Sequence, residues 1–103
     1  MNVELRCFGP VREAVGTKSA TRELPEGATV ADLLSELVED APDLDGQLLD
    51  ETGEVSGSIN VTVDGDNVRQ LDGAATALSD GDVVRIAPPV VGGGGRQRRE
   101  RGS

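Results

Sequence analysis

The sequence contains no histidine, tryptophan or tyrosine, and a single cysteine, Cys7. Without histidine, the chain cannot build a Ser-His-Asp triad, a histidine general base or a histidine-ligated zinc site. One cysteine excludes an internal disulfide framework and an all-cysteine metal site. These absences argue against an enzyme, so any chemistry has to use a different kind of group.

Long apolar runs are also missing from the sequence. No stretch approaches the ~20 apolar residues of a membrane span. Residues 1–5 show neither the basic nor the apolar region of a secretion signal. We therefore expect a cytoplasmic protein without a membrane partner. Phe8 is the only aromatic residue, so the core has to be built from the 25 valines, leucines and isoleucines.

Basic residues are scarce until the end of the chain. Residues 1–95 hold 18 acids and 6 bases, a net charge of −12, whereas residues 96–103 hold four arginines and one glutamate, a net charge of +3. A body of this charge repels phosphate groups, which disfavours nucleic-acid binding. An acidic surface with only one lysine is typical of halophilic proteins, because molar salt shortens the Debye length to ~3 Å and screens the repulsion.

Hydrophobic periodicity predicts the order β-β-α-β-β-β. Alternation of apolar and polar residues, bounded by Gly, Pro and Asp turns, is typical of half-buried strands. A helical turn is expected over 11–15, and a polar loop over 43–57. The expected strands are 3–7, 18–24, 59–63, 67–70 and 82–87.

One segment has the full pattern of an amphipathic helix. Thr29 is a suitable N-cap, and Asp32 three residues later completes a capping box. Pro42 then ends the helix, because proline disfavours helix before it. This predicts a helix over about 29–40. Its apolar stripe consists of Val30, Leu33, Leu34, Leu37 and Val38.

One helix can cover only one face of a sheet. The other face stays in solvent, which fits the polar alternates Glu4, Arg6, Asn60 and Thr62. We therefore predict an α+β roll, with a mixed sheet of four or five strands and one main helix packed on one face. The first and last strands can run parallel at its centre, linked through the helix.

The last strand leads into Pro88-Pro89-Val90-Val91 and then four glycines, 92–95. Two prolines favour an extended exit from the sheet. Glycines have no side chain and few backbone restrictions, so they can thread a narrow channel. Such an end can deliver a terminal carboxylate to another enzyme, although four glycines alone are also compatible with a plain linker.

Residues 78–93 resemble the C-terminal signature of the MoaD/ThiS family, in which an Asp-Gly-Asp turn and a last strand lead into Pro-Pro-Val-x-Gly-Gly. The acidic, lysine-poor body is most similar to the small archaeal modifier proteins. The resemblance implies a β-grasp, ubiquitin-like domain over 1–87, a flexible functional tail over 88–95 and a disordered basic extension over 96–103.

The resemblance also implies a function as a protein modifier and sulfur carrier. An E1-like enzyme, carrying zinc and using ATP-Mg, would adenylate the carboxylate of Gly93, which follows Gly92. The product would be a thiocarboxylate, with sulfur for molybdopterin or tRNA, or an isopeptide bond to lysines of target proteins. The chain itself would bind no cofactor, and would be at most the small subunit of molybdopterin synthase beside its large subunit.

In the family, the exposed sheet face and the base of the tail dock on the activating enzyme. We expect a monomer that uses this surface for its partner. The docking residues would be Phe8, Ile86, Pro88, Pro89, Val90 and Val91.

The chain departs from the family by continuing for ten residues past Gly93. A peptide bond at Gly93 offers no carboxylate for adenylation. The extension is a precursor segment removed by a protease, with cleavage after Gly93 or after Gly95, or an addition made for expression. Otherwise the protein does not conjugate and is a β-grasp interaction module with a glycine linker and a basic tail.

Five further positions each have two interpretations. Cys7 is in phase with the buried side of its strand, so it packs in the core or has a redox or thioester role. Lys18 accepts an isopeptide bond or only solvates the surface. Phe8 lies on the outer sheet face or packs under the turn at 11–15. Asp80 and Asp82 form a turn or bind a metal.

Overall fold

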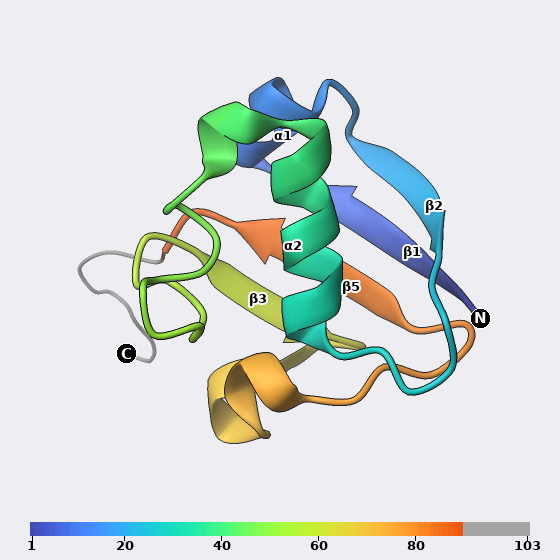
Figure 1. The fold of residues 1–103 in the computed structure, drawn as a ribbon. Coiled ribbons are helices and arrows are strands. Elements are labelled where there is room, and N and C mark those ends of the chain that lie inside the picture. The colour runs from blue at the N-terminus through green and yellow to red at the C-terminus, as the bar shows by residue number, and fades with distance from the viewer. Residues whose placement is uncertain (90–103) are drawn as a thin grey trace, which may run out of the picture.

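The computed structural model describes residues 1–89 of the 103-residue chain. Five strands and two helices are joined by turns and by one long loop before β3 (Figure 1). The elements are β1 (Asn2–Cys7), α1 (Gly9–Val15), β2 (Ser19–Glu23), α2 (Val30–Asp40), β3 (Asn60–Val63), β4 (Asp66–Asn67) and β5 (Val83–Ala87). None of the helices within residues 1–89 is long and apolar enough to cross a membrane.

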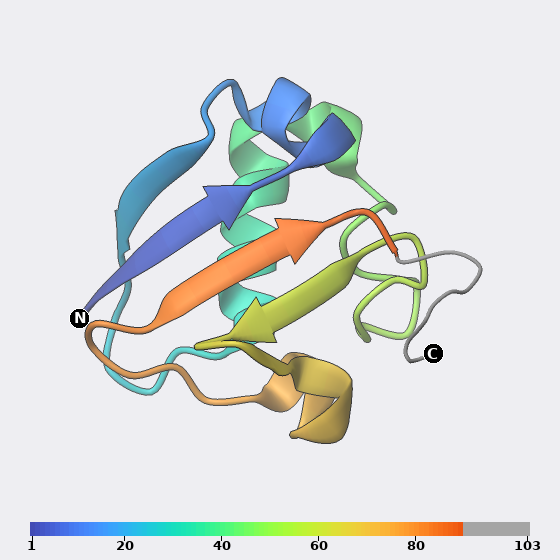
Figure 2. The ribbon, with the colours of Figure 1, turned by 180° about the vertical axis from the view of Figure 1, so that it is seen from behind.

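The strands form one mixed sheet in the order β2-β1-β5-β3-β4. β5, the last strand in sequence, lies between β1 and β3 (Figure 2). It runs parallel to β1, with Leu5 opposite Val84 and Cys7 opposite Ile86, and antiparallel to β3. The predicted mixed α+β sheet is therefore confirmed, with its first and last strands parallel and adjacent to each other.

The helix α2 crosses one face of this sheet (Figure 1). It starts with the expected capping box, because the Asp32 N–H donates to Thr29 Oγ1 and the Thr29 N–H donates to Asp32 Oδ2. The buried side chains of the helix are Val30, Leu33, Leu34 and Leu37. Val38, the last residue of the expected stripe, is only half-buried and packs against the edge of the core.

The core between α2 and the sheet is built from aliphatic side chains. The alternating inward residues of β1, β3 and β5 lie on one side of it, and the apolar stripe of α2 lies on the other. Leu44 and Leu48 tether the long loop before β3, and both are buried. Burial of such side chains stabilises the fold by roughly 1.5–3 kcal/mol each relative to exposure, so an aromatic-poor sequence still forms a complete core.

Two local expectations need correction. The strand expected over 67–70 ends at Asn67, because the Asn67 side chain accepts a hydrogen bond from the Arg69 N–H and caps a 3₁₀ turn over Val68–Gln70. That turn directs Val68 fully into the core. The helical turn expected over 11–15 begins earlier, at Gly9, and ends as expected at Val15, where Gly16 follows as the C-cap with a φ of +88°.

Candidate functional site

The chain leaves the sheet from its centre. β5 ends at Ala87, and Pro88 and Pro89 follow it as exposed residues. Because β1 and β5 are parallel, the exit lies beside the point where β1 passes into α1 (Figure 2). The N–H of Phe8 donates to the carbonyl of Ile86 over 3.0 Å, which fixes the two backbones to each other just before they diverge.

A small cleft adjoins this exit. Its volume is about 70 Å³, and apolar atoms form most of its surface. It joins the start of α1, the long loop before β3 and the first residue after β5, so the base of the C-terminal segment is one of its walls. The lining residues are Pro10, Val11, Gln47, Ser58, Ile59 and Pro88.

The sheet face opposite α2 carries polar side chains at its centre. Arg6 of β1 and Thr62 of β3 lie on either side of Arg85 of β5 in the strand register. Arg6 forms an ion pair with Glu4 on the same strand, and both side chains are exposed. Two arginines at neighbouring positions make this part of an otherwise acidic molecule locally basic.

Phe8 lies at the edge of this outer face. Its backbone is extended, with φ −134° and ψ 154°, so it continues the outward phase of Glu4 and Arg6. The side chain is half-buried and does not belong to the partly buried residues that pack on the core. Of the two interpretations, the outer-face position is therefore the one that the structure supports.

The remaining docking residues and the conjugation residues divide into three groups. Ile86 has no exposed surface, so its expected side-chain contact with a partner is wrong, because the residue has the inward phase of β5. Pro88 and Pro89 are exposed at the exit. The positions outside the described residues are Val90, Val91, Gly92, Gly93, Gly95 and the extension 96–103.

Cys7 and Lys18 lie in opposite environments near this end of the sheet. Cys7 is fully buried, and burial raises the pKa of its thiol, which disfavours the reactive thiolate. The structure therefore supports a packing role for Cys7. Lys18 is exposed in the connection between α1 and β2, where its amine is accessible. Its use as an isopeptide acceptor stays a prediction.

The aspartates before β5 organise the turn that starts the strand. Asp80 Oδ1 accepts a hydrogen bond from the Asn2 N–H at 2.7 Å, and Asp82 Oδ2 accepts one from the Ser79 N–H at 2.8 Å. Gly81 between them has a φ of +89°, which glycine adopts readily. The turn-forming interpretation is confirmed. No cluster of three or more potential metal-ligating side chains occurs within residues 1–89.

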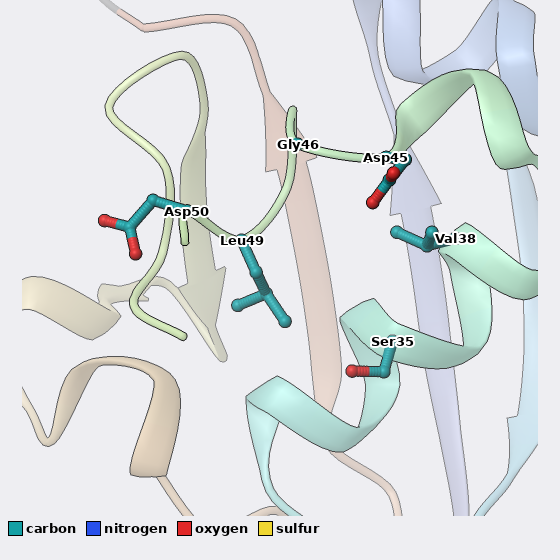
Figure 3. Close-up of a pocket in the computed structure, with 6 residues that line it drawn as sticks. All are labelled: Ser35, Val38, Asp45, Gly46, Leu49 and Asp50. Carbon is teal, nitrogen blue, oxygen red and sulfur yellow. The ribbon is translucent and has the colours of Figure 1, made fainter. Parts of the chain in front are cut away.

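A larger hollow of about 210 Å³ lies elsewhere, between α2 and the following loop. Figure 3 shows Leu49 extending toward α2, where Ser35 and Val38 form the facing wall, while the carboxylate of Asp50 turns away. Hydrogen bonds from Thr52 and Glu54 lower the pKa of Asp50, so this carboxylate organises its own loop. The lining also includes the Asp45 carboxylate and the Ser35 hydroxyl, but no hydrogen bond joins these two groups among the described residues, and we assign the hollow no reaction. No pattern in the sequence had indicated this hollow.

Comparisons with known proteins agree with this geometry. The ThiS family model matches residues 5–93. Small archaeal modifier protein 3 of Haloferax volcanii is 47% identical over 93 residues, which cover 90% of this chain and all of that protein. The molybdopterin synthase sulfur carrier subunit of Chlamydomonas reinhardtii is 33% identical over 93 residues, which cover 90% of this chain and 100% of that protein.

Among solved structures, the crystal structure of SAMP1 from Haloferax volcanii superposes with a TM-score of 0.73 at 29% identity. The match covers 90% of this chain and 100% of that chain. The arrangement of sheet and helix is therefore the β-grasp fold that the C-terminal signature implied.

Proposed function

The chain belongs to the ThiS family, and on this premise we propose that it is a ubiquitin-like protein modifier and sulfur carrier that acts through the carboxylate of Gly93. The observation that carries the proposal is where the family match stops. It ends at Gly93 and leaves ten residues of the chain beyond it. The two exposed prolines at the sheet exit stand a few residues before this glycine.

The chemistry requires an activating enzyme, because a carboxylate is a poor electrophile. An E1-like enzyme with ATP-Mg would join the Gly93 carboxylate to AMP and release pyrophosphate. A sulfur nucleophile would then displace AMP and leave a thiocarboxylate, or a lysine amine of a target protein would form an isopeptide bond. ATP-Mg and zinc would be bound by that enzyme, so this chain serves as its substrate and not as a catalyst.

The part played by the folded body is to present the C-terminal segment. The outer face around Arg6 and Arg85, with Phe8 at its edge, is the surface that we propose for the activating enzyme. Arginine and aromatic side chains are frequent anchors in protein interfaces. The exit at the centre of the sheet places Pro88 beside this surface, so one partner can contact the face and receive the segment.

Activation requires that the extension is removed first. A protease cutting after Gly93 would expose the carboxylate, whereas cutting after Gly95 would leave two extra glycines. The end of the family match at Gly93 favours the first position. The sulfur would pass to molybdopterin, with the large subunit of the synthase as partner, or to tRNA uridine.

A chain ended at Gly93 tests the proposal directly, because every strand, helix and core residue of the described fold lies before residue 90. With an E1-like enzyme from the same genome, ATP-Mg and a sulfur donor, its intact mass should rise by the replacement of one oxygen with sulfur. Deletion of Gly92 and Gly93 should abolish this gain and leave the melting temperature unchanged. An unmodified Gly93 chain, or a product after the deletion, would contradict the proposal.

The ten residues past Gly93 favour a second candidate function. A non-conjugating interaction module would keep its extension and bind a partner through the same outer face. This candidate predicts that the full chain and the chain ended at Gly93 bind the partner equally, because the carboxylate has no part in binding.

A further inference from the structure

Gly9 lies directly against the ring of Pro88. Gly9 is the residue at which the chain turns from β1 into α1, and its φ of +63° lies in the left-handed region. A Cβ atom added to Gly9 would lie 2.7 Å from Pro88 Cγ and 3.1 Å from Pro88 Cδ. Ordinary van der Waals contact starts at 3.4 Å, so the ring would have to move by about 0.7 Å.

The surrounding structure leaves the Pro88 ring as the part that would have to move. The hydrogen bond from the Phe8 N–H to the Ile86 carbonyl ties the two backbones together one residue before Gly9 and two residues before Pro88. The strands cannot separate to make room without losing that bond. Pro88 can yield, because its ring also lines the small cleft at the exit and is exposed there.

Other glycines of the described chain differ from Gly9 in this respect. Several have positive φ values, and for most of them an added Cβ would meet no atom within 4 Å. Gly73 would meet only Glu54 Oε1, the far end of a flexible side chain, at 3.2 Å. Turn geometry therefore explains those glycines, whereas Gly9 is additionally required for the position of the first residue after β5.

We infer that Gly9 is a positioning residue for activation of the C-terminal glycine. Because Gly9 has no side chain, Pro88 can pack against the α1 turn, and this contact sets the direction in which the segment leaves the sheet. Gly9 would touch no reacting atom and would act only through Pro88. The inference rests on the proposed function, since it concerns how the Gly93 carboxylate is offered to the activating enzyme.

Gly9→Ala tests the inference against Gly16→Ala as a matched control. Both substitutions place alanine at a position of positive φ at an end of α1, +63° at Gly9 and +88° at Gly16, so both carry a backbone cost. The Cβ atom of the control meets nothing within 4 Å, whereas that of Gly9→Ala meets the Pro88 ring. The probe is ATP–pyrophosphate exchange by an E1-like enzyme of the same genome, with each chain ended at Gly93.

We expect Gly9→Ala to lower kcat/KM for the carrier by about tenfold or more relative to Gly16→Ala, since misplacement of about 1 Å can cost about 100-fold. In a Pro88→Ala background, which removes the Cγ and Cδ atoms, Gly9→Ala should have no larger effect than Gly16→Ala. A purely structural cost of Gly9→Ala would persist in that background. Equal rates for the two glycine variants, or no rescue by Pro88→Ala, would overturn the inference.

Two further results distinguish a failure of the proposed function from a failure of the inference about Gly9. Exchange with the unsubstituted chain tests the proposed function alone, and the difference between the glycine variants tests the inference alone. A nuclear Overhauser contact between Gly9 Hα and the Pro88 ring of the full-length protein needs no substitution and is expected. Its absence would overturn the inference even if the Gly9 variant failed to fold.

Discussion

At the scale of single residues, the start of β5 holds two carboxylates close together. Asp64 Oδ1 accepts a hydrogen bond from the Val83 N–H, while Asp82 accepts one from the Ser79 N–H. Partial burial raises the pKa of Asp82, and the neighbouring Asp64 raises it further, against the lowering effect of the Ser79 N–H. The folded state therefore disfavours the charged form of Asp82.

This arrangement gives a pH dependence with a defined sign. A carboxyl group with a raised folded-state pKa binds its proton more tightly when folded, so its contribution favours folding at low pH and is lost as pH rises through the folded pKa. Asp82→Asn should therefore raise the free energy of unfolding at pH 7, because the amide oxygen still accepts from Ser79 without a charge. Urea unfolding at pH 7 and at pH 4 measures the free energy of unfolding of both the variant and the unsubstituted protein.

Asp66→Asn, at an exposed position at the start of β4, is the control for the general loss of negative charge. The gain from Asp82→Asn should exceed that of the control in dilute buffer, and the difference should shrink in molar KCl, where the Debye length is ~3 Å. A loss of stability in the Asp82 variant at pH 7 would contradict this account.

At the scale of elements, α2 depends on signals that lie within its own sequence. The Thr29 side chain accepts from the Asp32 N–H, and Asp32 accepts from the Thr29 N–H at 2.9 Å. Thr29→Ala should cost about 1 kcal/mol of unfolding free energy, because it leaves a helix N–H without its acceptor. Ser35→Ala, at an exposed position of the same helix, should cost less than about 0.5 kcal/mol. Equal effects of the two variants in urea unfolding would show that the capping box does not stabilise α2.

Local signals of this kind explain what the sequence could predict. The bounds of α2 follow from its cap, its apolar stripe and Pro42, and the strands follow from alternation. These bounds need only residues near each other in the chain. The parallel pairing of β1 and β5 joins distant segments, and it is predicted from the general rule that parallel strands need a long crossover connection.

The features that the sequence could not predict depend on contacts between distant segments. β4 ends early, and the 3₁₀ turn that follows it buries Val68 in the core. No residue close to Val68 in the sequence indicates this burial. The approach of Gly9 to Pro88 joins opposite ends of the fold. Ile86 was wrongly placed on the docking surface for another reason. Its alternation with Arg85 already indicated an inward side chain, and this sequence signal was not applied to the docking residues.

At the scale of the whole molecule, the charges are unevenly distributed. Residues 23–68, which include α2 and the long loop, contain no lysine or arginine, whereas Arg6 and Arg85 lie on the opposite sheet face. Arg22 of β2 pairs with two acids of α2, with Asp40 at 2.5 Å and with Glu36 at 3.9 Å. One arginine cannot offset the many acids around it, so self-repulsion should destabilise the fold in dilute buffer.

The melting temperature should therefore rise between dilute buffer and molar KCl, because salt screens repulsion between exposed charges. Molar KCl should bring a smaller rise to a variant in which Glu39 and Asp43, both exposed, are replaced by glutamine and asparagine. Differential scanning fluorimetry with an external dye can follow both proteins. A melting temperature that stays constant or falls with KCl would contradict a repulsion-limited fold.

The central claim is that the protein acts through the free carboxylate of Gly93, and the intact mass of the protein purified from its own cells tests this most directly. The account predicts a chain that ends at Gly93, with a fraction in which sulfur replaces one carboxylate oxygen. A single species that retains the arginines through Ser103 would contradict it, because the acyl group of Gly93 would then remain in a peptide bond.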